Sequence, residues 1–345
     1  MSTRVGVLMG GPSAEHEVSL ASGLEILKNL DRNAYRARAV VISREGRFFH
    51  CDADAELPSS GDLAAPGDAR MFEGPLDAGM TGPLWEKLDV AVLGLHGSFG
   101  EDGRIQGFLD TVGIPYTGSG VSASAIGMDK IASQWIFQAA GMTTPPSSVY
   151  TCGHPEVDVD ALAERHGFPC YAKCPQSGSS RLMGRAGSRA ELERLLDDLS
   201  PHADQILVES SVDGDEYSCP VLEYPDGSLA ALPPILIRPL SSSFFDYTAK
   251  YAAGACEEIV PAPCPPGLTR RIQECARKAH AVLGCRGLTR TDMIVKDGSL
   301  YILELNTLPG LTPASLAPKA FAAAGGTYSQ LLDILVETAL RVRRV

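Results

Sequence analysis

The N-terminal part of the chain alternates short apolar runs with amphipathic stripes, and this alternation limits the folds open to it. The apolar runs lie at residues 4–9, 38–42 and 89–95, and the stripes at residues 20–27 and 105–112. Continuous apolar runs are typical of buried parallel strands, and strands that alternate with helices predict a parallel, doubly wound sheet. We expect this sheet to form a first domain, residues 1–128, with the Gly- and Pro-rich stretch 51–82 as a surface excursion.

The remainder of the chain predicts two smaller α+β units. The first, residues 129–215, begins with a helix at 128–140 and places a leucine-striped helix between strands at 168–173 and 205–209. The second, residues 216–345, carries strands, a long helix and a hairpin. Their expected bounds are 216–222 and 228–232 for the strands, 268–279 for the helix and 288–305 for the hairpin. The chain is therefore expected to be an α/β protein of three domains.

Composition excludes several classes of protein. The chain has 345 residues, too many for one ordinary core, and a net charge of −12, which argues against a nucleic-acid partner. Its nine cysteines are scattered and form no CxxC pair, which favours free thiols in a reducing compartment over zinc or disulfides. No basic, apolar leader opens the chain, and no apolar run is long enough to span a membrane. We expect a cytoplasmic protein.

The hairpin carries four polar residues at even-numbered positions: Arg290, Asp292, Glu304 and Asn306. A three-residue loop, 296–298, would place Arg290 opposite Glu304 and all four side chains on one face. A two-residue loop would put Asp292 and Glu304 on opposite faces. Two carboxylates and an amide oxygen on one face suit Mg²⁺, whereas the alternative is a solvated strand face with incidental ion pairs.

Three further segments are compatible with anion or ligand binding. Lys173 ends an apolar run and precedes the small residues 178–180, whose backbone N–H groups could approach phosphate oxygens. Residues 10–13 form a similar turn before a helix. His96 follows a buried strand, at the end where parallel sheets bind ligands. Glycine-serine segments of this kind are usually ordinary turns, and His96 is equally well explained as a structural histidine.

Taken together, these segments resemble the D-alanine–D-alanine ligases of the ATP-grasp superfamily, in the right order along nearly the whole chain. The segments that carry the resemblance are residues 10–19 (GGPSAEHEVS), 96–107, 116–120 (YTGSG), 128–130 (MDK), 178–180 (GSS), 246–251 (DYTAKY) and 304–310 (ELNTLPG). The resemblance implies a three-domain ATP-grasp architecture in which the two α+β domains enclose the nucleotide. It implies ligation of two D-alanine molecules through an acyl phosphate, for the synthesis of peptidoglycan precursor.

The resemblance also implies roles for individual residues. The catalytic group is Glu15, Ser179, Tyr251, Arg290 and Gly310, of which Glu15 orients the first amino acid, and Arg290 and Gly310 stabilise developing negative charge. The groups that bind the amino acids are His96, Ser315 and Leu316. The nucleotide group is Lys130, Lys173, Glu209, Ser210, Ser211, Val212, Glu216 and Lys250. The metal ligands are Asp292, Glu304 and Asn306, for two Mg²⁺ ions, with Mn²⁺ as a substitute.

The chain departs from the family pattern near the nucleotide. Leu182 stands where the phosphate-covering loop usually has glycine, and Cys174 follows Lys173 where proline is usual. These departures keep two alternatives open: a specialised ligase of other D-amino acids, and a non-catalytic relative that binds nucleotide or amino acid. Homodimers are common in the family, and the sequence leaves the oligomeric state open.

Overall fold

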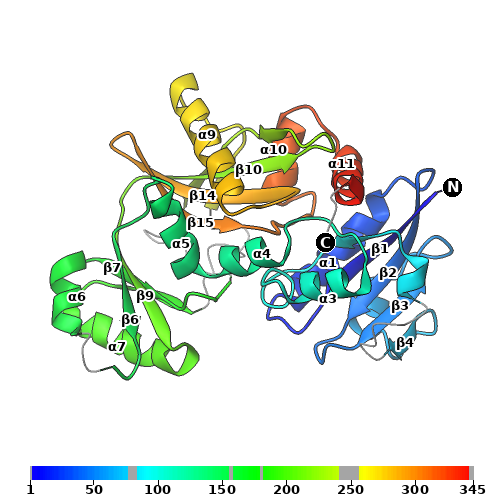
Figure 1. The fold of residues 1–345 in the computed structure, drawn as a ribbon, viewed down its shortest axis with the longest axis horizontal. Coiled ribbons are helices and arrows are strands. Elements are labelled where there is room, and N and C mark those ends of the chain that lie inside the picture. The colour runs from blue at the N-terminus through cyan, green and yellow to red at the C-terminus, as the bar shows by residue number, and fades with distance from the viewer. Residues whose placement is uncertain (1, 77–83, 155–157, 179–181, 241–255, 342–345) are drawn as a thin grey trace.

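The computed structural model describes residues 2–76, 84–154, 158–178, 182–240 and 256–341. Its strands form three separate sheets (Figure 1). A five-stranded and a four-stranded sheet lie at opposite ends of the molecule, and a six-stranded sheet lies across the top between them.

The N-terminal sheet has the order β4-β3-β2-β1-β5. Its strands are β1 (Thr3–Gly10), β2 (Tyr35–Ile42), β3 (Phe48–Asp52), β4 (Glu73–Leu76) and β5 (Val90–Leu93). β1 pairs in parallel with both β2 and β5, as the apolar runs predict, whereas β3 and β4 are antiparallel. The stretch 51–82 is therefore more than a surface excursion, because it holds the end of β3, helix α2 and strand β4.

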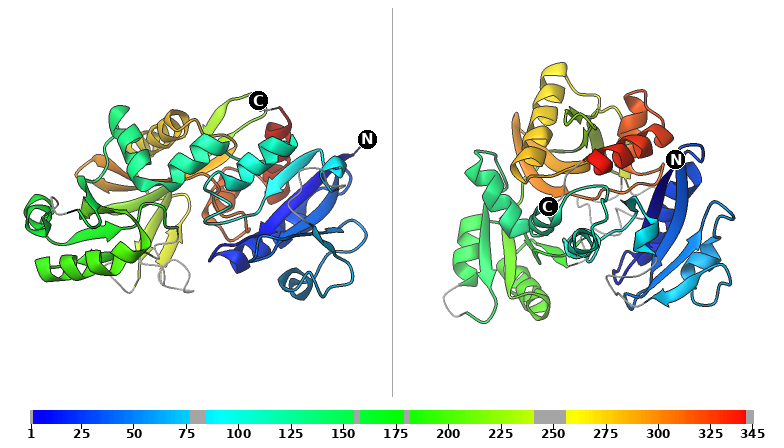
Figure 2. Two further views of the ribbon diagram at one scale, coloured as in Figure 1. Left: turned by 60° about the horizontal axis from the view of Figure 1, so that its bottom comes forward. Right: turned by 45° about the vertical axis from the view of Figure 1, so that its right-hand side comes forward.

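Helices cover both faces of this sheet. They are α1 (His16–Asn29), α2 (Ser60–Ala64), the short 3-10 helix η1 (Trp85–Lys87) and α3 (Arg104–Val112). α3 ends at Gly113, whose φ of 73° closes the helix as the sequence predicts. The C-terminal helix α11 (Tyr328–Arg341) returns to pack against α1 and β5, beside the N-terminal strands (Figure 2).

The four-stranded sheet has the order β6-β9-β7-β8 and is entirely antiparallel. Its elements are β6 (Ser147–Thr151), α6 (Val159–His166), β7 (Cys170–Lys173), β8 (Met183–Ala186), α7 (Arg189–Leu199), η2 (Ser200–His202) and β9 (Gln205–Ser210). Leucines of α7 pack on this sheet as their spacing predicts. The helix expected at 128–140 is α5 (Lys130–Ala139), which Asp129 caps, and a further helix, α4 (Val121–Met128), precedes it.

The six-stranded sheet carries the β14–β15 hairpin at its edge. Its elements are β10 (Asp215–Glu223), β11 (Leu229–Ala231), β12 (Ile235–Pro239), β13 (Cys256–Ile259), α9 (Pro266–Val282), β14 (Leu288–Lys296) and β15 (Ser299–Asn306), followed by α10 (Leu316–Ala323). α9 buries Ile272, Ala276 and Ala279, the stripe that the sequence predicts. Among the described helices, none has the length and apolarity to cross a membrane.

Candidate active site

Two adjoining cavities meet at the β14–β15 hairpin. One, of about 420 Å³, lies between the four-stranded and six-stranded sheets, and we call it the sheet-side cavity. The other, of about 410 Å³, is also lined by loops of the N-terminal sheet, and we call it the N-terminal cavity. Lys130, Glu216, Ile237, Asp292 and Glu304 line both. Four of these five residues are charged, so they form a largely polar wall between two ligand-sized spaces.

The hairpin loop has two residues, and not the three that would have placed Arg290 opposite Glu304. Lys296 pairs directly with Ser299, which leaves Asp297 and Gly298 as the loop. Both have positive φ, 48° and 75°. Left-handed conformations at both positions give a turn whose twist matches the flanking strands, which is why Asp-Gly favours this short loop.

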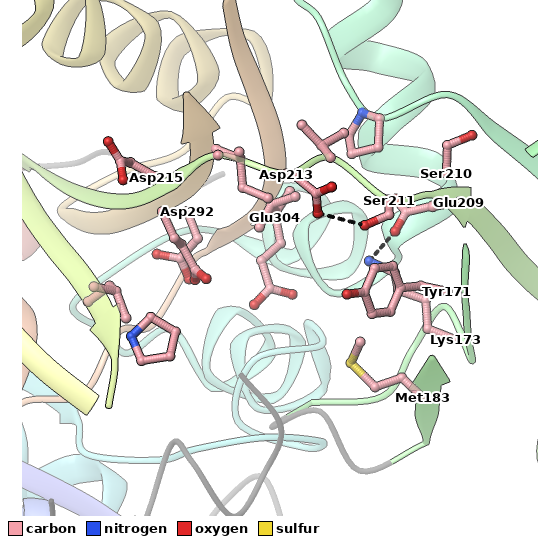
Figure 3. A pocket seen from close by; sticks show the side chains of 18 of the residues that line it. Tyr171, Lys173, Met183, Glu209, Ser210, Ser211, Asp213, Asp215, Asp292 and Glu304 are labelled. Carbon is pink, nitrogen blue, oxygen red and sulfur yellow. Dashed lines mark hydrogen bonds and ion pairs between the residues drawn. The ribbon is translucent and has the colours of Figure 1, made fainter. Parts of the chain in front are cut away.

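A β-bulge restores the arrangement that the short loop alone would have broken. Met293 pairs with Ile302, but the next pair along is Asp292 with Glu304, so Leu303 is the extra residue of the bulge. Asp292 and Glu304 are thus opposite each other and point into the cavity from neighbouring strands (Figure 3). The predicted convergence of the carboxylates is confirmed, with a different register.

Asp292 is held tightly at this wall. Arg290 donates to both of its oxygens, at 2.9 Å from Nε and 2.7 Å from Nη2, and the Ser218 hydroxyl donates to Oδ1 at 2.5 Å. Arg290 pairs with Asn306 across the strands, rather than with Glu304 as predicted, because the bulge shifts the register. Both Arg290 and Asp292 are largely buried, which makes their charge-assisted hydrogen bonds strong.

The oxygen donors of this wall fit Mg²⁺. Glu304 lies 3.3 Å from the Lys130 ammonium, and Asn306 Oδ1 accepts the N–H of Leu308 at 3.0 Å. Among the described residues, no cluster of three or more His, Cys, Asp or Glu side chains could hold a metal ion. A set of two carboxylates, an amide oxygen and substrate phosphates is the kind that Mg²⁺ uses, whereas zinc prefers nitrogen and sulfur.

The sheet-side cavity contains a buried ion pair. Lys173 pairs with Glu209 (Figure 3). The other oxygen of Glu209 accepts a hydrogen bond from Gln134. The Gln134 carbonyl in turn accepts from the Ser147 hydroxyl at 2.9 Å. Lys173 and Glu209 are 8% and 2% exposed, so each depends on the other for compensation of its charge. Lys173 therefore faces the cavity with its position already fixed.

The predicted hinge, residues 209–212, forms one side of the same cavity. Ser210 turns its hydroxyl away from the cavity and towards His166 Nδ1, 3.0 Å away, and the other ring nitrogen lies 2.9 Å from Ser148 Oγ. Burial lowers the pKa of His166, which favours the neutral ring between two hydroxyls. Glu216 lines both cavities one strand further along.

Apolar side chains complete the sheet-side cavity. These are Tyr171, Met183, Val212, Leu236, Ile237, Ile294 and Leu303. They come from both sheets, so a flat ligand could be held between the two α+β units, with Lys130 and Lys173 beside it. The cavity thus combines an apolar slot with ammonium groups and carboxylates.

The N-terminal cavity is lined by Glu15 and His96. A Cβ at Gly97, where φ is 71°, would lie 2.5 Å from Oε2 of Glu15, so glycine is needed for this close approach. His96 is buried, with Nε2 2.8 Å from the Ser22 hydroxyl, and its carbonyl accepts from Ser13 at 2.8 Å. Burial lowers the pKa of His96, which favours the neutral ring.

The opposite wall of this cavity is formed by Gly310, Ser315 and Leu316. The Thr312 hydroxyl and Ser315 Oγ lie 2.8 Å apart, and the Thr312 N–H donates to Ser315 Oγ at 3.2 Å. Ser315 precedes α10, so the N–H groups of the first turn of that helix are close by. Such helix starts favour carboxylates.

Several predicted residues lie outside the described residues: Ser179, Lys250 and Tyr251. Leu182 is described, and it packs partly buried against the core of the four-stranded sheet. Its carbonyl accepts the N–H of Cys174 at 2.8 Å. The leucine thus has a packing role that a glycine would lack.

Sequence reasoning missed three polar residues of the site: Ser218, Gln134 and Glu101. Ser218 is the cross-strand partner of Asp292, and Gln134 reaches Glu209 from helix α5, so only the tertiary pairing reveals them. Glu101 lies in the loop that follows His96 and lines the N-terminal cavity. The sequence could have indicated Glu101, because it is an acidic residue five positions after His96, which is a predicted ligand contact.

Comparison with protein families matches both ends of the chain. The profile described as "D-ala D-ala ligase N-terminus" matches residues 4–119, and the one described as "D-ala D-ala ligase C-terminus" matches residues 136–337. Together the two profiles cover the N-terminal sheet and most of the wall and cavities described above.

Relatives match over nearly their full length. The D-alanine–D-alanine ligase of Syntrophobacter fumaroxidans is 41% identical, over 97% of each chain, and that of Leptospira biflexa is 37% identical, over 98% of this chain and 99% of the relative. Among solved structures, the VanG D-Ala:D-Ser ligase from Enterococcus faecalis matches with a TM-score of 0.86 and 28% identity, over 98% of this chain and all of that one. The ATP complex of the Bacillus anthracis D-alanine–D-alanine ligase matches with a TM-score of 0.76 and 33% identity, over 99% and 98%.

Proposed function

Since the chain belongs to the D-alanine–D-alanine ligase family, we propose that it joins two D-alanine molecules at the expense of ATP, supplying peptidoglycan precursor. One observation carries the assignment to this cleft: Asp292 and Glu304, paired across a bulged hairpin, form the wall that the two cavities share. A reaction that transfers a phosphoryl group from a nucleotide to an amino acid needs such a polar boundary between its two substrates. The same two carboxylates argue against a non-catalytic relative.

The sheet-side cavity is the site for ATP. Adenine lies against the hinge, residues 209–212, between the apolar side chains of the two sheets, and Glu216 takes the ribose. Lys130 and Lys173 face the phosphates, joined by Lys250. Lysine ammonium groups act on phosphates as point charges, which offsets the repulsion between the nucleotide and the carboxylates of the wall.

Asp292, Glu304 and Asn306 are the residues that would hold two Mg²⁺ ions, with Mn²⁺ as a substitute. When bound, the ions neutralise the phosphate oxygens and so make the terminal phosphorus open to attack. Ser218 and Arg290 fix the orientation of Asp292, so that its carboxylate keeps one geometry during the reaction.

The N-terminal cavity is the site for the two amino acids. Glu15 takes the ammonium of the first, with Ser179 and Tyr251 as its hydrogen-bonding partners, and His96 lies beside it. Ser315 and Leu316, at the start of α10, take the carboxylate of the second. Fixing amine and carboxylate at separate walls selects one handedness, so L-alanine should be a poor substrate.

The chemistry proceeds in two steps. A carboxylate oxygen of the first D-alanine attacks the terminal phosphorus of ATP, ADP leaves, and an acyl phosphate forms. The amine of the second D-alanine then attacks the acyl carbon, and phosphate leaves as the peptide bond forms. Arg290 and the Gly310 N–H stabilise the negative charge that develops on the acyl oxygen, as preorganised donors do in other acyl transfers.

The remaining features of the proposal concern organisation and location. We place the domain boundaries at residues 1–128, 129–215 and 216–345, in line with the three sheets. A small-molecule ligase of this kind acts in the cytoplasm, and a homodimer is the oligomer to test first. D-alanine and ATP are the substrates, and neither nucleic acid nor a membrane takes part.

The test is ADP and phosphate release with ATP, Mg²⁺ and a panel of amino acids. D-alanine should support release together with D-alanyl-D-alanine, and L-alanine should not. D-serine belongs on the panel because a D-Ala:D-Ser ligase shares this fold closely. Preference for another second D-amino acid would identify a specialised ligase, and no release with any D-amino acid would refute the enzymatic proposal.

A further inference from the structure

The carboxylate of Glu101 lies in the N-terminal cavity without an assigned role. Its side chain is 13% exposed, and it lines the cavity with Glu15, Arg290 and Glu304. Oε1 accepts the N–H of Gly97 at 2.8 Å, and the Glu101 N–H donates to the Gly97 carbonyl at 2.9 Å. This pair of hydrogen bonds holds the carboxylate at the surface of the cavity in one orientation.

Among the described residues, no lysine or arginine forms an ion pair with Glu101. Its nearest basic group is His96, whose Nδ1 is 4.0 Å from Oε1 and whose pKa burial lowers, so that the neutral ring is favoured. The charged groups that face Glu101 are Glu15 before α1, Arg290 on β14 and Glu304 on β15. Two of these three are acidic, so the surroundings favour a bound cation or proton.

Burial, and then the neighbouring charge of Glu15, raise the pKa of Glu101 to about 8. A glutamate usually titrates at about 4.3, which makes it too weak a base for an ammonium group. A buried carboxylate with a raised pKa is better matched to accept a proton from an amine at neutral pH. The match matters because the second amino acid arrives as an ammonium ion, and only the neutral amine has the electron pair that attacks an acyl phosphate.

We propose that Glu101 is the catalytic base that takes a proton from the ammonium group of the second amino acid, and that His96 and Ser22 support the loop that carries it. This inference rests on the proposed function. It follows from the place of Glu101 in the amino-acid cavity, its fixed orientation and the absence of a lysine or arginine partner among the residues described.

The proposed step begins at the ammonium group of the second amino acid. One N–H bond of the ammonium breaks, its proton passes to the Glu101 carboxylate, and the freed electron pair forms the new C–N bond. The C–O bond to phosphate then breaks, and phosphate leaves with the electron pair of the C–O bond. The second proton lost by the nitrogen goes to the departing phosphate, and Glu101 returns its proton to water.

Glu101→Gln tests the proposal, because the amide still accepts from Gly97 but cannot take up a proton. Hydroxylamine is the probe, since it is uncharged at neutral pH and intercepts acyl phosphates without losing a proton first. We expect dipeptide formation to fall about a hundredfold, and D-alanine hydroxamate formation with ATP to change by less than about twofold. The ratio of the two products is therefore the readout.

Glu258→Gln is the matched control. It removes another carboxylate from the same cavity, but one that is paired with Lys319 at 2.7 Å. This variant should keep the native ratio of dipeptide to hydroxamate. Glu101→Asp, a shorter base, should recover part of the dipeptide rate that Glu101→Gln loses. In the native protein the ratio should rise with pH and level off near pH 8, as the basic form of Glu101 accumulates, whereas in Glu101→Gln it should keep rising because only amine that is already neutral in solution can react.

Three outcomes would overturn the inference. Equal loss of both products in Glu101→Gln would mean that Glu101 only supports the cavity. Unchanged dipeptide formation would mean that it takes no part. A ratio that also levels off near pH 8 in Glu101→Gln would place the base elsewhere. Failure of the proposed function is distinguishable, because the native protein would then form no hydroxamate.

Discussion

The two cavities of the cleft differ in how their charges are compensated. In the sheet-side cavity, Lys173 and Glu209 form a buried ion pair, and Gln134 donates a further hydrogen bond to Glu209. In the N-terminal cavity, Arg290 pairs with Asp292 and Lys130 with Glu304, and Glu101 has no lysine or arginine partner among the described residues. Carboxylates outnumber lysines and arginines in the lining of both cavities, but the buried Glu209 carboxylate of the first has its cation in the fold, whereas Glu101 of the second does not, among the described residues.

The difference indicates which kind of ligand suits each cavity. Buried charge is costly unless it is paired, so an excess of carboxylates is best matched by ligands that are themselves cations. The ammonium groups of two amino acids and the proposed Mg²⁺ ions are such ligands. The Lys173–Glu209 pair of the sheet-side cavity, by contrast, can help to position a nucleotide without being rearranged first.

The largest expected effect comes from Glu304→Gln, which removes charge at the shared wall without changing volume. Loss of a metal-binding carboxylate should remove several kcal/mol of transition-state stabilisation, about a thousandfold in kcat. Thermal unfolding should stay close to that of the native protein, since Glu304 is partly exposed. Turnover within about tenfold of native would remove Glu304 from the metal site.

The next effect is on stability, in the sheet-side cavity. Lys173→Met leaves the Glu209 carboxylate buried without its cation, which should cost about 3 kcal/mol. Glu209→Gln in the same chain should recover most of that loss in a denaturant titration. Arg44→Met, which breaks an exposed ion pair with Glu17, should leave the midpoint nearly unchanged. A double variant no more stable than Lys173→Met would show that the two residues are not coupled.

The fold was predictable where local pattern and burial agree. The runs that became β1, β2 and β5 are continuous and apolar, and Gly113 ends α3 as its position predicts. The register of the β14–β15 hairpin was not, because Asp297 and Gly298 set a short loop while the bulge at Leu303 depends on packing of both faces. The short loop alone would have put Asp292 and Glu304 on opposite faces, and the bulge shifts the register by one residue. Together they leave both carboxylates on the same face.

The site was predictable only in part, for a similar reason. Asp292 and Glu304 carry their own chemical signal and were found from the sequence and the resemblance. Ser218 and Gln134 act through partners from other elements, Asp292 and Glu209, which no local pattern shows. Residues that support a site are recognised only when the sheets are assembled.

A smaller effect is expected at Leu182, at the edge of the sheet-side cavity. Leu182→Gly removes a partly buried side chain and adds backbone freedom, which together should cost about 1–2 kcal/mol of stability. Because the loop end would be less well anchored, ATP should bind more weakly to this variant. Calorimetric titration with ATP, alongside thermal unfolding, checks both. Tighter ATP binding would show that leucine strains the loop instead.

The smallest effect is expected at the hinge. Ser210→Ala removes the hydrogen bond to His166, at a cost of about 1 kcal/mol or less. Since the Ser210 hydroxyl points away from the cavity, the KM for ATP should rise by less than about fivefold and the KM for D-alanine should not change. A change confined to D-alanine would contradict the division of the cleft into two cavities with separate ligands.

The central claim is that phosphoryl transfer across the shared wall links the two cavities, and an isotope experiment tests it most directly. D-alanine carrying heavy oxygen in its carboxylate is incubated with ATP, Mg²⁺ and the protein, and the released phosphate is analysed by mass spectrometry. The account predicts one labelled oxygen in each phosphate, in step with the dipeptide formed, because that oxygen bridges carbon and phosphorus in the acyl phosphate. Phosphate released without label would mean that water, and not D-alanine, attacks ATP, and would contradict the account.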